Sequence, residues 1–270
     1  MKLDKMGRGS MANSEIILNS QKAEDGRRSQ QADYEALSKE LAEKELELAT
    51  LENELAAFED QYARTIGVLF AELDEIEREI ARELWHLHPE EKYHRNFQDA
   101  ERKARASQDA IKDKLAQAKK KVFKPSDELR NLFRRVAKAI HPDLAASEDE
   151  IAYRTILMSR ANIAYNNGDI EALKQILVDW ENRDRLSISD DVHLDTQDYL
   201  ERKILRIKAR IKEIETRIAA LKESELYKLM LAVEQADQQG RDLLKEMADS
   251  LHLQIQQAKR RLDSLRQQRK

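Results

Sequence analysis

The sequence predicts an all-α protein in which long coiled-coil helical hairpins flank a small helical unit. The 270 residues include only 6 Gly and 3 Pro. A sheet protein needs Gly, Pro, Asn or Asp at a turn every ~8–12 residues. Charged residues make up 37% of the chain and aromatic residues 5%, and heavy use of Ala, Glu, Leu, Lys and Arg is typical of coiled coils.

Several classes of protein are excluded by composition. There is no Cys, which excludes disulfides, thiolate metal sites and Cys nucleophiles. No apolar run approaches the ~18 residues of a membrane span, and no secretory signal is recognisable, so we expect a cytoplasmic protein. The balance of 48 basic and 52 acidic residues gives no reason to expect nucleic-acid binding. No arrangement typical of an enzyme or a cofactor site stands out.

The first 30 residues are polar, contain Gly and show no period, which predicts a disordered tail over residues 1–30. From about Asp33, apolar residues recur at spacings of four and three, as in a helix that buries one stripe. These apolar residues form two successive stripes, and the second stripe is shifted by one residue from the spacing of the first. The residues of the first stripe are Leu37, Leu41, Leu48, Leu51, Leu55, Phe58 and Tyr62, and those of the second are Ile66, Leu69, Leu73, Ile76, Ile80, Leu84 and Leu87. The shift predicts a local irregularity.

A helical hairpin is predicted over residues 31–121. Pro89 ends the first arm, and a weaker seam continues from Glu90 to Lys121. Residues 31–90 hold 17 acidic and 5 basic residues, whereas residues 91–140 hold 7 acidic and 15 basic. Opposite charge favours antiparallel pairing of the two arms. Pairing with other copies in a homo-oligomer stays open, because such charges do not distinguish the two cases.

Residues 124–181 break the heptad pattern and predict a compact unit. Ser126 can cap a helix whose apolar residues share one face: Leu129, Leu132, Phe133, Val136, Ala137 and Ile140. Basic residues occupy another face: Arg130, Arg134, Arg135 and Lys138. The helix must stop at His141-Pro142-Asp143, because proline forbids its continuation. Ser147 opens a second helix through a capping box.

The second helix is predicted to place six residues largely on one face: Ile151, Leu157, Met158, Ala161, Ala164 and Tyr165. Gly168 suits a left-handed cap at its end, and Asp169 can cap a short buttress helix. The unit is therefore predicted as an antiparallel helix pair joined by an exposed His-Pro-Asp loop.

This unit resembles the J-domain of DnaJ-type co-chaperones over about 50 of the 270 residues. The resemblance lies in the basic helix around Phe133, in His141-Pro142-Asp143 and in the late Ala164-Tyr165 pair. The chain contains a second, similar tripeptide, His88-Pro89-Glu90, with which the first can be compared. It follows an acidic helix and ends in Glu instead of Asp. Only the later site has the surroundings that this family requires.

The resemblance implies docking on the nucleotide-binding domain of a DnaK-type chaperone, with acceleration of ATP hydrolysis. It implies that Asp143 pairs with a partner arginine, that Pro142 keeps the loop rigid and that His141 fixes the loop or contacts the partner. The basic residues Arg130, Arg134, Arg135 and Lys138 would steer and orient an acidic surface, in a salt-sensitive manner.

Two departures from the family pattern are visible. The family's first helix is not recognisable, and Ile111–Phe123 is expected to replace it; Met158 stands where the family has Phe. The absence of Cys and of a Gly/Phe-rich segment indicates a specialised type without zinc, in which coiled coils select an unknown client. A coiled-coil scaffold or adaptor with a structural J-like unit stays open as the alternative.

The C-terminal part is predicted as a polar linker over residues 182–196 and a coiled coil over residues 197–270. Seven seam positions follow one another: Leu200, Ile204, Ile207, Ile211, Ile214, Ile218 and Leu221. A register break lies near Lys222–Glu225, where Ser224 can cap a new helix that runs on to Leu265. A hairpin is favoured and one long helix is the alternative. No metal site is expected, because His86 and His88 do not share a helix face.

Overall fold

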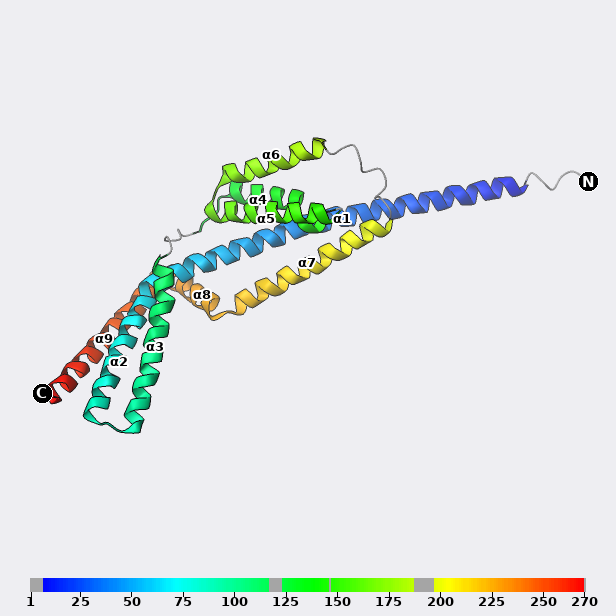
Figure 1. Ribbon diagram of the computed structural model, residues 1–270. Coiled ribbons are helices and arrows are strands. Elements are labelled where there is room, and N and C mark those ends of the chain that lie inside the picture. Colours follow the sequence, from blue (N-terminus) through cyan, green and yellow to red (C-terminus); the bar gives the residue numbers. More distant parts are fainter. Residues whose placement is uncertain (1–6, 117–122, 146, 187–196, 270) are drawn as a thin grey trace, which may run out of the picture. The chain divides into compact units, whose positions relative to one another are not determined.

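The computed structural model describes residues 7–116, 123–145, 147–186 and 197–269. Every regular element in these ranges is a helix, which confirms the all-α prediction (Figure 1). The chain divides into two compact units. The first unit comprises the chain up to Leu51 together with Pro125–Ala220. The second comprises Glu52–Lys124 and Leu221–Lys270. In the described ranges no helix has the length and apolarity needed to cross a membrane.

The first helix is longer than the sequence predicted. Helix α1 (Gly7–Tyr62) is helical from Gly7, so most of the stretch expected to be a disordered tail is helical. Residues 7–30 contain no proline. Extending an existing helix adds one hydrogen bond for each residue fixed and needs no new nucleus, so the strong seam that follows can carry helix into this polar stretch.

Three helices of the first unit pack against one another: α4 (Asp127–Ile140), α5 (Glu148–Asn167) and α6 (Ile170–Leu186). The predicted apolar face of α4 is buried along its whole length, at Leu129, Leu132, Phe133, Val136, Ala137 and Ile140. On α5 the predicted face is buried from Leu157 to Tyr165, whereas Ile151 is exposed. The ring of Phe133 lies against that of Tyr165 with centroids 4.6 Å apart, so these aromatic rings join α4 to α5.

Local signals placed the ends of these helices correctly. The Ser126 hydroxyl accepts a hydrogen bond from the Leu129 N–H, and Ser147 does the same for Glu150. Gly168 ends α5 in the left-handed region, at φ 69°, where a side chain would be strained. Helix α6 continues to Leu186, into the predicted linker. The rest of that linker, residues 187–196, lies outside the described residues.

The part of α1 up to Leu51 and most of α7 (Gln197–Glu223) complete the first unit and run parallel to each other. Gln30 bonds Glu201 near the start of α7, and Lys44 pairs with Glu215 farther along both helices. The α7 seam is buried at Ile207, Ile211, Ile214 and Ile218.

Among the described residues, helix α1 contacts the α4–α5 pair. It does so through the ion pair of Glu43 with Arg134 and through the Thr50 hydroxyl, 2.7 Å from that of Tyr165. Segment Ile111–Phe123 was expected to supply a helix in this place, and its residues 117–122 lie outside the described residues. The apolar seam of α1 is stronger than that of Ile111–Phe123, so α1 gains more by covering this face.

In the second unit, α2 (Val68–Leu87) lies between α3 (Glu91–Ala116) and α9 (Leu243–Gln268) (Figure 1). Helix α3 runs antiparallel to α2 beyond the turn at His88-Pro89-Glu90: Lys103 pairs with Asp74, and Lys114 with Glu59. The predicted hairpin over residues 31–121 is therefore only partly formed. The stretch of α1 before Glu52 belongs to the first unit instead.

The one-residue shift of the α1–α2 seam coincides with a π-helical segment, η1 (Ala63–Gly67). A π turn adds one residue to the helical repeat. It therefore lets Ile66 and Leu69 continue, on the same side of the helix, the buried stripe to which Phe58 belongs. All three side chains are buried. The irregularity predicted from spacing is confirmed, and its structural form is this turn.

The described part of the C-terminal segment, residues 197–269, forms three successive helices rather than one continuous coiled coil or one long helix. Helix α7 ends at Glu223, and Ser224 caps α8 (Glu225–Gln238) by accepting from the Tyr227 N–H, as predicted. The predicted final helix breaks again at Gly240, at φ 74°, before α9 begins. Helix α9 then runs parallel to α2, with ion pairs Lys259–Glu72 and Arg266–Glu79. The buried apolar stripe of α7 thus lies in the first unit, and that of α9 lies in the second.

We expect Phe133→Ala to lower the free energy of unfolding of the first unit by about 3–5 kcal/mol, because it leaves a cavity in a closed core. Phe133 has no exposed surface. Urea unfolding followed by Trp180 fluorescence measures this in a Trp85→Phe background, since Trp180 lies in the first unit and Trp85 in the second. Ile156→Ala is the control: Ile156 is 60% exposed, and its change should stay within about 0.5 kcal/mol. Equal losses would contradict the described core.

Candidate functional site

The His-Pro-Asp turn stands at the end of α4. His141 leaves the helix with extended backbone, at ψ 132°, as expected for a residue before proline. Pro142–Leu144 then form a single 3₁₀ turn, η2, closed by hydrogen bonds from the Leu144 N–H to the His141 carbonyl and from the Ala145 N–H to the Pro142 carbonyl. The backbone of the turn is therefore held by its own short-range bonds.

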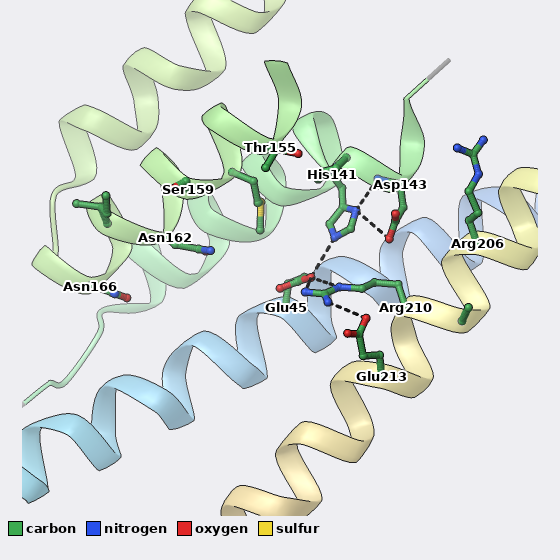
Figure 2. Close-up of a pocket in the computed structure, with 14 residues that line it drawn as sticks. Glu45, His141, Asp143, Thr155, Ser159, Asn162, Asn166, Arg206, Arg210 and Glu213 are labelled. Carbon is green, nitrogen blue, oxygen red and sulfur yellow. Dashed lines mark hydrogen bonds and ion pairs between the residues drawn. The ribbon is translucent and has the colours of Figure 1, made fainter. Parts of the chain in front are cut away.

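His141 is 4% exposed, and its imidazole is bonded at both ring nitrogens. Nδ1 accepts the Asp143 backbone N–H at 3.1 Å, and Nε2 lies 3.0 Å from Oε1 of Glu45 on α1. A nitrogen that accepts an N–H cannot itself carry a proton. The bonding pattern therefore assigns the ring proton to Nε2, which donates it to Glu45 (Figure 2).

Glu45 is itself held by Arg210 of α7. The Arg210 guanidinium donates to Oε1 of Glu45 from Nε at 3.1 Å and from Nη2 at 3.0 Å, and to Glu213 from Nη1 at 2.9 Å. Burial pushes the pKa of Glu45 upward, but the hydrogen bond from His141 and the charge of Arg210 outweigh burial. The net effect is a lowered pKa for Glu45, so its carboxylate is ionised at neutral pH.

Arg154 of α5 holds the opposite side of the turn. Its Nη1 donates to the carbonyls of Ala139 and His141, at 2.9 and 3.2 Å, and its Nε donates to Glu150. Both carbonyls lie at the end of α4, where the helix itself supplies no N–H for them; that of His141 also accepts the Leu144 N–H. The sequence interpretation missed Arg154. The available signal was a basic residue between Ile151 and Leu157, two apolar positions of the predicted face.

A cleft of about 910 Å³ opens beside the turn. Its walls are α5 and α7, and Figure 2 shows the His141 and Asp143 side chains at one end. The side chain of Asp143 is 31% exposed. Polar residues line the cleft on both walls: Thr155, Ser159 and Asn162 from α5, and Arg206, Arg210 and Glu213 from α7. Asp143 is thus the member of the turn that a bound group could reach.

The predicted basic face is divided in two. Arg135 and Lys138 are exposed, whereas Arg130 is half-buried. Arg134 is occupied, because its Nε lies 3.2 Å from a carboxylate oxygen of Glu43 on α1. The four residues therefore do not form one free surface, and two of them remain available to a partner.

The exposed loop that the sequence predicted is not what the structure contains. His141 is buried, and Pro142 and Asp143 are half-buried. The reason is that α1 places Glu45 over the imidazole and α7 secures that carboxylate. Neither helix could be assigned to this place from the pattern of α4 and α5.

The earlier histidines lie in the second unit, among aromatic rings. His94 stacks on Trp85 at 4.6 Å between centroids, and His88 stacks on Tyr93 at 5.3 Å. Across the described ranges, no three His, Asp or Glu side chains come together in a way that could hold a metal ion.

Comparisons of the chain with protein-family models, with curated proteins and with solved structures each returned no match. What the site can do chemically follows from its residues. Both nitrogens of His141 are already bonded, so the ring has no free acceptor with which to activate a nucleophile. A half-exposed carboxylate on a braced turn and two exposed cations are suited to binding a charged protein surface.

We expect the stability conferred by Glu45 to disappear in acid. Because the pKa of Glu45 is lowered from its ordinary value of 4.5, this contribution is complete above that value and is lost as pH falls through the lower pKa of the folded state. The gap in unfolding free energy between wild type and Glu45→Gln should therefore narrow as the pH falls below 4.5. Urea titrations followed by Trp180 fluorescence measure it. A gap independent of pH would contradict the ionised pairing.

Proposed function

We propose that this protein is a J-domain-like co-chaperone that docks on a DnaK-type chaperone and stimulates its ATPase. The observation that carries the proposal is the braced His141-Pro142-Asp143 turn at the end of a helix that exposes Arg135 and Lys138. The chain would act by binding rather than by chemistry of its own, without a cofactor, in the cytoplasm.

Docking would use the charges that the fold leaves accessible. Asp143 would pair with an arginine of the DnaK-type chaperone, in a charge-assisted hydrogen bond. Arg135 and Lys138 would face an acidic surface of the same partner and speed its approach, so that binding weakens as salt rises. Arg134 and Arg130 would contribute less, because Arg134 is paired with Glu43 and Arg130 is half-buried.

The long helices would supply the second half of the function. We propose that they select an unknown client protein, or a second copy of the chain, as coiled-coil segments do. Helices α2, α3 and α9 are the candidates, because they belong to a unit that does not contain the His-Pro-Asp turn. Nucleic acid and membrane are not proposed as partners.

A second candidate function is favoured by one observation. His141 is 4% exposed and is bonded to Glu45. The turn can therefore have the purely structural role of attaching the end of α4 to α1. In that case the protein is a coiled-coil scaffold or adaptor, and its J-like unit is structural. Such a scaffold has no use for a half-exposed carboxyl group on Asp143.

We expect Asp143→Asn to reduce the stimulation of ATP hydrolysis by about tenfold or more, because it removes the charge from the proposed arginine contact. Single-turnover hydrolysis by a bacterial DnaK-type chaperone, with and without each variant, measures the effect. Glu90→Gln is a matched control, since it makes the same kind of change at His88-Pro89-Glu90 in the second unit.

The control should stimulate as well as wild type. If wild type fails to accelerate hydrolysis by several DnaK-type chaperones, the co-chaperone proposal is wrong and the scaffold function stands. If Asp143→Asn stimulates as well as wild type, the turn is not the contact site.

A further inference from the structure

The orientation of Asp143 depends on helices outside the α4–α5–α6 group. The Asp143 backbone N–H is bonded to Nδ1 of His141, and Nε2 of the same ring is bonded to Glu45. Arg210 of α7 donates two hydrogen bonds to the Glu45 oxygen that receives the imidazole. A single line of hydrogen bonds thus runs from Arg210 through Glu45 and His141 to Asp143 (Figure 2).

Each link in this line restricts the next one. The imidazole can accept from Asp143 only while its proton is on Nε2, and a buried Nε2–H needs an acceptor. Glu45 is that acceptor. Its own ionised state is secured by Arg210, because an unpaired buried carboxylate would be costly. Glu213 holds the far side of the Arg210 guanidinium, at 2.9 Å.

We infer that Glu45 and Arg210 are positioning residues that hold the backbone at Asp143 through His141 and so set the direction in which its side chain leaves the turn. The inference rests on the proposed function for its consequence, because a fixed carboxylate matters when a partner arginine must meet it. Neither residue belongs to the segment that resembles a J-domain. The two long helices would therefore set the binding strength of a site that lies between α4 and α5.

The opposite possibility is that α1 and α7 mask the turn. Two observations favour positioning over masking. The Asp143 side chain is 31% exposed, and the cleft beside it is open, with a volume of about 910 Å³. Glu45 of α1 contacts the ring of His141, and Arg210 of α7 contacts Glu45, so neither is bonded to the Asp143 carboxylate (Figure 2).

The first measurement is a titration of ATPase stimulation against the concentration of the full-length protein. Glu45→Gln keeps the size of the side chain and removes its charge. We expect it to raise the half-maximal concentration about tenfold, as expected when a charged hydrogen-bond partner is lost. Arg210→Gln should act in the same direction, because it leaves Glu45 without its counter-charge.

Glu215→Gln is the matched control. Glu215 also joins α7 to α1, through Lys44 at 3.6 Å, but none of its contacts involves Glu45 or His141. A general weakening of the α1–α7 pair would affect Glu215→Gln as well, whereas the positioning effect would not.

The second measurement does not involve a chaperone. Nitrogen-15 NMR of histidine-labelled protein distinguishes the two ring tautomers, and a His141→Gln variant identifies the His141 signals. We expect the Nε2–H form alone in wild type and in Glu215→Gln. In Glu45→Gln we expect a mixture of tautomers, while far-UV circular dichroism shows unchanged helix content.

The outcomes separate this inference from the proposed function. Loss of stimulation together with a mixed tautomer supports positioning, and a gain of stimulation in Glu45→Gln overturns it in favour of masking. An unchanged tautomer in Glu45→Gln overturns it whatever the ATPase result. If wild-type protein stimulates no DnaK-type chaperone while the tautomer responds as expected, the proposed function fails and the relay from Arg210 to Asp143 stands by itself.

Discussion

A buried carboxylate is the constraint around which the first unit is arranged. Glu45 is 6% exposed, and a charge so far from water must be paired and hydrogen-bonded. Its partners, His141 and Arg210, lie 96 and 165 residues away in sequence. Satisfying one side chain therefore brings together the middle of α1, the end of α4 and the middle of α7. The same three segments line the cleft beside the turn.

The rest of the architecture follows from the need of each helix to cover an apolar stripe. The first part of α1 packs in the unit that holds α4 to α7, and the stripe beyond the π segment packs in the unit that holds α3 and α9. Helix α2 carries acidic residues that meet basic residues of α9, as in the Lys259–Glu72 pair. Exposed pairs of this kind contribute little stability. We therefore expect them to set the register in which the two helices pair rather than to hold the helices together.

The site combines a rigid interior with an accessible carboxylate. Arg154 and Glu45 hold His141 from two sides, through its carbonyl oxygen and its ring. The turn that carries Asp143 is consequently held by contacts within the first unit. In the proposed docking, such a turn would lose less entropy on binding, and its carboxylate would favour a partner arginine in one direction.

The sequence by itself determined the helical class, the ends of α4 and α5, the seam shift before Ile66 and the break at Ser224. These features depend on neighbours within a few residues: caps, proline, glycine and the spacing of apolar positions. Only the tertiary structure decided that His141 is buried, that Arg154 caps α4 and that α7 joins α1. Apolar stripes on long helices are nearly interchangeable, so the choice among partners depends on the sum of many distant contacts. One buried ion pair, Glu45 with Arg210, is among those contacts, and no local pattern marks its two ends as partners.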